Sequence, residues 1–300
     1  MEPRRRRPLV GLLYNPAIPA LVDAAPELVE CIEVVPDRLW YDFGERNPRG
    51  RFHRVHGAIE TLRRCCRGRV VTGHGIGLSL PSAMPLDAEL VGAVADTHRD
   101  LGFAWYSEHM SAFVVPHGRV PNAQAGLGLP VPYDEEVLAL LRGKLAGLSG
   151  ALGVPLLMEN GSIFAPLPDL DFTEPAFFNR LYAEGSCALL LDLHNLLVSA
   201  RNGAQDPRAY LDELDRDAVH EVHLAGGDEL SGFYTDSHSR LTPEPVWEWA
   251  YEELPRCRNL RALVFEFHES YFERIGLDAL VDELERLHAL ADVLAPAGTA

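Results

Sequence analysis

The sequence predicts one α/β domain, a (β/α)8 TIM barrel. Short apolar runs rich in β-branched residues alternate along the chain with segments of helical periodicity. Some of these runs are continuously apolar, as in Ala188-Leu189-Leu190-Leu191, which is typical of strands that a parallel sheet buries on both faces. No glycine-rich phosphate loop follows the first run, and this disfavours an open doubly wound sheet.

Eight apolar runs are expected to be strands, and each is followed by a segment with one apolar face. The expected strands are Leu9–Asn15, Cys31–Pro36, Arg69–Gly75, Phe103–Met110, Pro155–Asn160, Ala188–Asn195, Ala218–Gly227 and Arg261–His268. The expected helices are Pro19–Leu28, His56–Arg67, Leu90–Leu101, Val137–Leu148, Pro175–Glu184, Asp206–Leu214, Pro243–Glu253 and Leu277–Leu294. Thr173 and Gly185 flank the fifth helix with ordinary start and stop residues.

Composition narrows the class of protein. The 300 residues are 47% hydrophobic and 24% charged, which excludes a disordered chain, and no apolar run approaches the ~20 residues that span a bilayer. The formal net charge of −17 argues against a nucleic-acid partner. Residues 1–300 are therefore expected to form a single domain with neither a nucleic-acid nor a membrane partner. A basic tail at 1–8 and a loose tail at 295–300 are expected at its ends.

The five cysteines form neither a disulfide framework nor a zinc ribbon, because their number is odd and no C-x-x-C spacing occurs. A reducing cytoplasm is the expected compartment.

Residues that close the strands are the candidates for chemistry, because the active site of a TIM barrel forms at the carboxyl ends of its strands. Imidazoles and carboxylates close six of the eight runs, and two more follow the seventh. The candidates are His74, His109, Glu159, Asp192, His223 and Glu266 at strand ends, and Asp236 and His238 in the loop. Each alone has an ordinary structural explanation, but together they must converge on one small mouth.

This convergence predicts a metal centre. Burying several carboxylates together without a cation would cost several kcal/mol each. Imidazole and carboxylate ligands suit Fe, Mn, Zn or Co, and eight ligands exceed the needs of one ion, so two or three ions are expected, with a carboxylate such as Glu159 bridging them. The residues expected to orient the ligands or to face the substrate are Glu33, Glu108, Asn160, His194 and Asn195.

Seven motifs occur in the order of a known family. They are His74-Gly75-Ile76-Gly77-Leu78-Ser79-Leu80, Ser107-Glu108-His109-Met110, Glu159-Asn160, Leu190-Leu191-Asp192-x-x-Asn195, His223-Leu224-Ala225-Gly226, Asp236-Ser237-His238-Ser239 and Val246-Trp247. With them, the chain resembles the multinuclear non-heme iron-dependent oxidative enzymes (MNIO), which include the methanobactin-biosynthesis oxidase. The resemblance runs from about Leu9 to Phe272, nearly the whole chain.

The resemblance implies a xylose-isomerase-like barrel that holds two or three irons as mixed Fe(II)/Fe(III), with O2 as co-substrate. Members oxidise residues of ribosomally synthesised precursor peptides, often cysteine and in some cases a C-terminal Asp or Asn. The expected partners are thus a precursor peptide and a separate peptide-recognition protein. By motif position, the eight candidate ligands named above are the iron ligands.

Three departures from the family pattern lie on the side of the barrel mouth. The first strand reads Val10-Gly11-Leu12-Leu13-Tyr14-Asn15-Pro16 in place of a Gly-Leu-Arg-like opening. The second ends Glu33-Val34-Val35-Pro36 without a Glu-Asn pair, and His194 stands where Asn is common. These departures indicate a divergent substrate.

Other functions fit parts of the pattern. A divalent-metal sugar isomerase or epimerase would use the same barrel and paired carboxylates, with Mn or Mg and without O2. A zinc phosphodiesterase is disfavoured by the net charge and by the shortage of Lys and Arg near the strand ends. A degenerate barrel that only binds peptides is disfavoured because it would have no reason to keep a complete ligand set.

Overall fold

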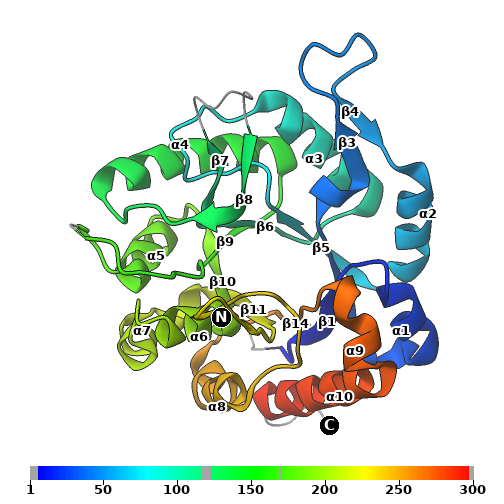
Figure 1. The fold of residues 1–300 in the computed structure, drawn as a ribbon, viewed down its shortest axis with the longest axis vertical. Helices are drawn as coiled ribbons and strands as arrows, with labels where there is room; N and C mark the ends of the chain where they lie inside the picture. The colour runs from blue at the N-terminus through cyan, green and yellow to red at the C-terminus, as the bar shows by residue number, and fades with distance from the viewer. Residues whose placement is uncertain (1–5, 116–122, 169, 297–300) are drawn as a thin grey trace.

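The computed structural model describes residues 6–115, 123–168 and 170–296. Within them, eight parallel strands close into a barrel, in the spatial order β1-β14-β11-β10-β9-β6-β5-β2 (Figure 1). They are β1 Leu9–Leu13, β2 Cys31–Val34, β5 Val70–Gly75, β6 Tyr106–His109, β9 Leu156–Glu159, β10 Ala188–Asp192, β11 Val219–Leu224 and β14 Ala262–Phe265. Each lies within one of the predicted runs, so the predicted (β/α)8 fold is confirmed.

Helices surround the barrel and cover the outer faces of its strands (Figure 1). They are α1 Ile18–Ala24, α2 His56–Cys65, α3 Ala88–Leu101, α4 Glu135–Leu152, α5 Glu174–Ala183, α6 Leu193–Arg201, α7 Pro207–Glu213, α8 Glu244–Glu253, α9 Phe272–Ile275 and α10 Leu277–Leu294. Local chemistry sets their ends. The carboxylate of Asp87 accepts the backbone N–H groups of Glu89 and Leu90 at the start of α3, and Gly102 ends that helix in the left-handed conformation.

Several predicted elements end earlier than expected, and a local cause is visible for two of them. The helix expected over Pro19–Leu28 stops at Ala24 and continues as the 3-10 turn η1, Pro26–Leu28, because Pro26 offers no N–H and disfavours helical geometry before it. The strand expected over Ala188–Asn195 ends at Asp192. The carboxylate of Asp192 accepts the N–H of Asn195 and so begins α6 in the same segment.

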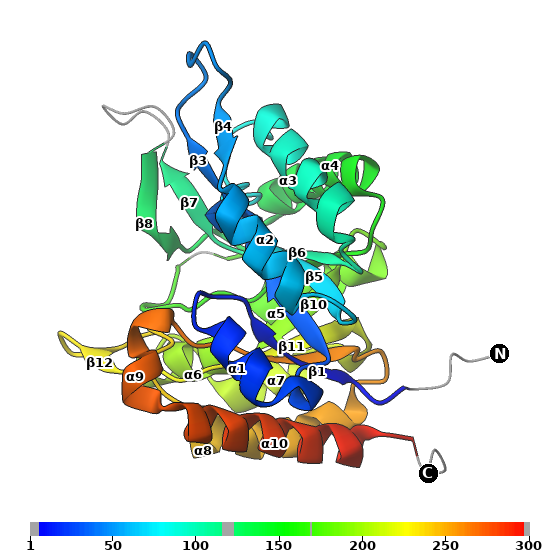
Figure 2. The same ribbon diagram turned by 90° about the vertical axis from the view of Figure 1, so that its right-hand side faces the viewer.

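Three two-stranded hairpins that the periodicity did not reveal follow the carboxyl ends of barrel strands. They are β3–β4 (Trp40–Asp42 and Phe52–Arg54), β7–β8 (Ala112–Val115 and Ala123–Leu129) and β12–β13 (Glu229–Leu230 and Phe233–Tyr234). They project from one side of the barrel, opposite the side on which β1 begins and α10 ends (Figure 2). This side carries the strand ends that hold the candidate ligands.

The barrel interior is apolar toward the amino ends of the strands and polar toward their carboxyl ends. Side chains alternate along each strand, so every second residue points inward. Leu13, Cys31, Trp105, Leu157 and Leu190 form part of the inner cluster. The inward positions further along the strands are polar, and they include the candidate ligands.

The first described residues are attached to the barrel. Arg7 Nη1 lies 2.9 Å from Glu30 Oε2, and its Nε lies 2.7 Å from Asp292 Oδ1 on α10. Arg7 is therefore held against the barrel, although it belongs to the basic tail expected over 1–8, of which residues 1–5 lie outside the described residues. The tail expected at 295–300 likewise lies outside from residue 297 onward. None of the helices in the described part of the chain has the length and apolarity needed to cross a membrane.

Candidate metal centre

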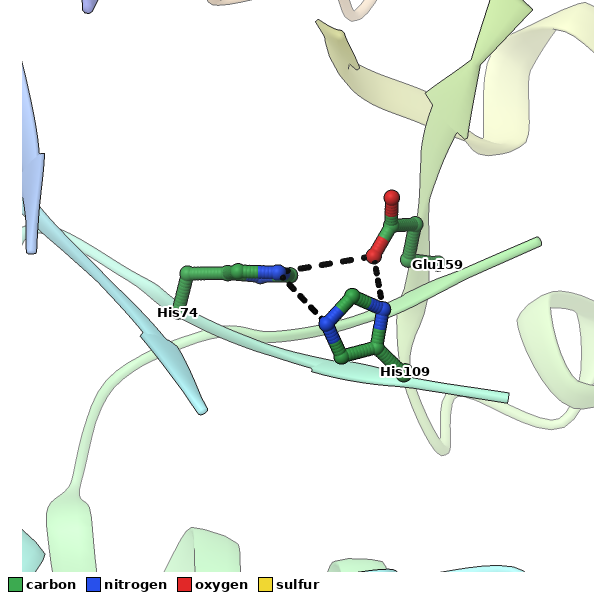
Figure 3. Close-up of side chains that lie close together, drawn as sticks. All are labelled: His74, His109 and Glu159. Atoms are coloured by element: carbon green, nitrogen blue, oxygen red, sulfur yellow. Dashed lines mark hydrogen bonds and ion pairs between the residues drawn. The ribbon is translucent and has the colours of Figure 1, made fainter. Parts of the chain in front are cut away.

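Two imidazoles and one carboxylate meet at the ends of β5, β6 and β9 (Figure 3). Nε2 of His74 lies 3.0 Å from Nε2 of His109 and 3.4 Å from Oε2 of Glu159. Nδ1 of His109 also contacts that carboxylate oxygen. Each of the three side chains, here called the outer group, offers a ligand atom within 4.8 Å of those of the other two, close enough for all three to bind one ion.

A hydroxyl beside the outer group orients His74. Ser107 Oγ lies 2.8 Å from Nδ1 of His74 and donates to the carbonyl of Gly73 at 3.2 Å. Because the hydroxyl hydrogen is used in this way, Ser107 accepts the hydrogen of Nδ1. The lone pair of His74 is therefore on Nε2, the atom that faces His109 and Glu159, and this tautomer is the one that binds a metal.

Glu159 also belongs to a second cluster, the central group, with Asp192 and His223. Its Oε2 faces the outer group, whereas its Oε1 lies 3.7 Å from Nδ1 of His223. One oxygen of Asp192 is used by the first turn of α6, and its Oδ2 is buried with no hydrogen-bond partner among the described residues. The two oxygens of Glu159 thus face two ligand clusters, the arrangement of a bridging carboxylate.

His223 is held between two carboxylates. Its Nε2 lies 2.8 Å from Oε2 of Glu33, and its Nδ1 lies 3.1 Å from Oε1 of Glu266. All three side chains are buried. A carboxylate on one imidazole nitrogen and a ligand cluster on the other is the usual environment of a metal-binding histidine. Glu33 therefore lies where it would orient His223.

Glu266 extends the cluster to the loop after β11. Its Oε2 lies 3.3 Å from Nε2 of His238, which in turn lies 2.9 Å from Oδ1 of Asp236. Asp236, His238 and Glu266 are here called the loop group. His238 adopts a positive φ of 48°, a strained conformation for a residue with a side chain. Like Glu159, Glu266 presents its two oxygens to two clusters.

The eight candidate ligands are thus brought together, and the residues expected around them take different places. Asn160 bonds both backbone groups of Asp192, with its Nδ2 at 2.9 Å from the carbonyl and its Oδ1 at 2.7 Å from the N–H. Asn195 Nδ2 donates to Glu159 Oε1 at 3.3 Å, and His194 Nδ1 lies 2.9 Å from Asp236 Oδ1. Glu108 points away from the cluster, and its Oε1 accepts the Tyr106 hydroxyl at 2.7 Å.

Burial and the charges of neighbouring side chains shift the pKa values of the candidate ligands. Burial, and after it the charge of Glu159, raises the pKa of Asp192 well above its ordinary value. Burial alone would lower the pKa of His109 and His238, but Glu159 raises that of His109 to about 9 and Asp236 raises that of His238 to about 10. At neutral pH the metal-free cluster therefore holds protons in place of cations.

The residues present fit metal ions. Among the described residues, Asp192 Oδ2, His223 Nδ1 and His238 Nε2 are buried without a hydrogen bond of acceptable geometry, although each faces the cluster. Buried polar atoms without partners are rare in folded proteins. Oxygen and imidazole nitrogen, with no thiolate, form a donor set suited to iron, manganese, zinc or cobalt.

The cluster opens to solvent on one side. The side chains of His109, Asp236 and His238 are 22%, 24% and 23% exposed, whereas those of Glu159 and Glu266 are almost fully buried. A cleft of about 1110 Å³ lies between β3–β4, β7 and the segment after β5, and Trp40, Phe43, Leu86 and Val114 contribute to its walls. None of the candidate ligands lines it, but the ring of Phe113, next to Val114, lies 5.3 Å from that of His109.

Sequence reasoning missed three residues around the site. Ser107 could have been found because it lies two positions before His109 and so shares its inward face. Asp37, at the edge of the cleft, accepts the N–H of Ile76 at 3.2 Å, and burial raises its pKa. Tyr234, whose hydroxyl lies 3.2 Å from His194 Nε2, belongs to a hairpin that periodicity did not reveal.

Residues 11–292 match the family model of the RiPP precursor modification enzymes MbnB/TglH/ChrH. The chain belongs to this family. A relative from Chromobacterium violaceum, a UPF0276 protein, is 30% identical over 258 residues, which cover 86% of this chain and 90% of the relative. A UPF0276 protein from Streptomyces avermitilis is 32% identical over 278 residues, 91% of this chain and 54% of its own length.

Solved structures share the barrel of this MbnB/TglH/ChrH family member. A xylose isomerase domain protein from Planctomyces limnophilus has a TM-score of 0.54 and 16% identity, covering 98% of this chain and 99% of its own. Endonuclease IV from Thermus thermophilus has a TM-score of 0.54 and 17% identity, covering 95% and 99%. D-psicose 3-epimerase from Clostridium cellulolyticum has a TM-score of 0.53 and 11% identity, covering 92% and 98%. At these identities the likeness shows the xylose-isomerase-like fold alone.

Proposed function

We propose that this protein is a multinuclear non-heme iron enzyme that uses O2 to oxidise a residue of a ribosomally synthesised precursor peptide, at cysteine or at a C-terminal Asp or Asn. Membership in the family of precursor modification enzymes supports the substrate class. The observation that carries the metal assignment is the sharing of Glu159 and Glu266 between neighbouring ligand clusters.

Each shared carboxylate would hold two ions next to each other. Glu159 would join the outer and central groups, and Glu266 would join His223 to the loop group. Iron bound in these groups supplies the redox chemistry with O2. The protein positions the ions through Ser107, Glu33 and Asn160, none of which needs to react. Burial of most of the ligands excludes water from all but one side of the centre.

The substrate residue would approach from the open side, next to His109, Asp236 and His238. The cleft beside β3–β4 is lined by apolar and aromatic side chains together with charged ones, and Tyr41 and Phe43 of this hairpin are 64% and 58% exposed. Exposed aromatic side chains around a cleft are typical of peptide and protein contact surfaces. We infer that the precursor peptide lies along this cleft and that a separate recognition protein delivers it.

The test is metal content and oxygen use in protein purified anaerobically. The expected result is two or three irons per chain, fewer in Asp192→Ala, and O2 consumption on addition of the precursor peptide. A matched control is Asp206→Ala, which removes a carboxylate that caps α7 and does not belong to the cluster. Manganese or magnesium without iron, and no dependence on O2, would overturn the proposal in favour of a sugar isomerase or epimerase.

A further inference from the structure

Asp236 differs from most candidate ligands because it lies in a loop rather than at the end of a barrel strand. Its side chain is nevertheless held on two sides. Oδ1 lies 2.9 Å from His238 Nε2 and 2.9 Å from His194 Nδ1. His194 is fully buried in the first turn of α6, so a rigid element of the barrel contacts a carboxylate on a loop.

The contacts beyond His194 fix which of its nitrogens carries a hydrogen. The carboxylate of Asp236 only accepts, so Nδ1 of His194 must donate to it. On the other side of the ring, Nε2 lies 3.2 Å from the hydroxyl of Tyr234. The N–H of Gly227 donates to that hydroxyl oxygen at 3.2 Å, which leaves the hydroxyl hydrogen for Nε2. The bonds therefore run in one direction, from Gly227 through Tyr234 and His194 to Asp236.

The residues around His194 and Tyr234 leave room for these two side chains and hold Tyr234 in place. A side chain at Gly227 would meet Cε1 of His194 at 3.2 Å and would crowd the backbone of Thr235. Tyr234 is fixed to the end of α6, because its N–H and carbonyl bond the side chain of Asn202 at 3.1 and 2.8 Å. The guanidinium of Arg201 lies 4.2 Å from the centre of the tyrosine ring.

We propose that His194 and Tyr234 are positioning residues that set the carboxylate of Asp236 for a metal ion in the loop group. The inference rests on the proposed metal centre and names the residues that complete its third cluster. Tyr234 is the last residue of the β12–β13 hairpin, whose tip exposes Leu230 and Phe233 at 68% and 48%. The hairpin is thereby joined to a metal ligand through two side chains.

The test is titration of the metal-free protein with Fe(II) without oxygen, followed by iron analysis and Mössbauer spectroscopy. His194→Ala is expected to lose about one iron per chain, as Asp236→Ala does. His194→Asn should restore it, because the asparagine amide lies where Nδ1 lies and donates to Asp236. Tyr234→Phe is expected to weaken the least tightly bound iron about tenfold. Tyr210→Phe, which removes a buried hydroxyl with no hydrogen-bond partner in the described chain, is the matched control.

The outcomes separate this inference from the proposed function. His194→Ala with the iron count and affinity of the unaltered protein would overturn the positioning role and leave the oxidase proposal standing. Loss of every iron together with a collapse of the melting temperature would also overturn it, since a structural role would then suffice. Normal iron loading in the unaltered protein with no O2 consumption on any precursor peptide would contradict the oxidase and leave the positioning role intact.

Discussion

Ser107 Oγ lies 2.8 Å from Nδ1 of His74, and this contact decides which nitrogen of His74 is free. The serine hydrogen is engaged by the carbonyl of Gly73, so the hydroxyl accepts from the imidazole. The contact between these two side chains fixes the tautomer of His74 without a charged neighbour. Burial, and next to it His109, lowers the pKa of His74, which keeps the ring neutral with its lone pair toward the cluster.

Ser107→Ala is expected to weaken metal binding in the outer group by about tenfold, because His74 loses the acceptor that fixes its tautomer. Competition with a chromophoric chelator measures the affinity. Thr72→Val, which removes a buried hydroxyl without a hydrogen-bond partner among the described residues, should leave the affinity unchanged. Equal affinities in Ser107→Ala and the unaltered protein would contradict the assigned orientation.

Glu159→Gln is expected to lower the metal content by at least one ion per chain, because an amide supplies one oxygen where the carboxylate presents two to separate clusters. Elemental analysis after anaerobic loading measures this. The matched control is Glu108→Gln, an equally buried glutamate whose Oε1 contacts Tyr106 rather than the cluster. If both variants kept the full metal content, the bridging role would be wrong.

Metal binding is expected to release protons and to tighten as the pH rises from 6 toward 9. The pKa of His109 is raised to about 9 by Glu159 and that of His238 to about 10 by Asp236, although burial opposes both shifts. A metal must displace these protons, so more of them are bound, and the apparent affinity is lower, at low pH. Calorimetric titration in two buffers of different ionisation enthalpy measures the number released. A pH-independent affinity would contradict this.

Gly75→Ala is expected to destabilise the fold by about 1–3 kcal/mol, because the added methyl group would overlap the Tyr106 hydroxyl and the Glu108 carboxylate. Urea unfolding followed by circular dichroism measures the change. Gly92→Ala on α3, where a methyl group meets nothing within 4 Å, should stabilise the protein by about 0.5–1 kcal/mol. A neutral result at Gly75 would show that the two side chains can move aside.

His220 is expected to make the protein less stable in mild acid. Burial, and then the charge of Arg261, lowers its pKa to about 4, whereas the unfolded imidazole titrates near about 6.5. Between these values the unfolded chain binds a proton that the folded chain does not, so the free energy of unfolding falls as the pH drops from about 6.5 to about 4. His220→Gln should flatten this dependence, and His56→Gln, at an exposed position on α2, should not.

The strand ends could be predicted from sequence because each strand is marked by the composition of its own short segment. Eight apolar runs must be buried, and a polar residue that closes such a run must lie at the mouth of a barrel, so His74, Glu159 and Glu266 were placed without knowledge of distances. The pairing of oxygens was not predictable. Which oxygen of Glu159 faces His223 depends on side-chain torsions that only the closed barrel determines.

Local competition between strand and helix explains why the strand expected over Ala188–Asn195 ends at Asp192. His194 and Asn195 continue an apolar run in sequence, but the cap formed by Asp192 turns the chain into α6. Glu108 lies on the same strand as His109, β6, yet alternation puts the two side chains on opposite faces. The strands of the β12–β13 hairpin have two residues each, too few to show periodicity, so Tyr234 carried no sequence signal.

The two ends of the barrel differ, and this difference has a practical consequence for handling the protein. Strand β1 begins at Leu9 and helix α10 ends at Leu294 on the face away from the three hairpins (Figure 2). Arg7 joins the two by contacting Asp292. A linker attached beyond either element would tether the barrel to a bead or sensor surface by the face away from the hairpins. The face that carries the hairpins and the candidate ligands would then be turned outward for capture of peptides.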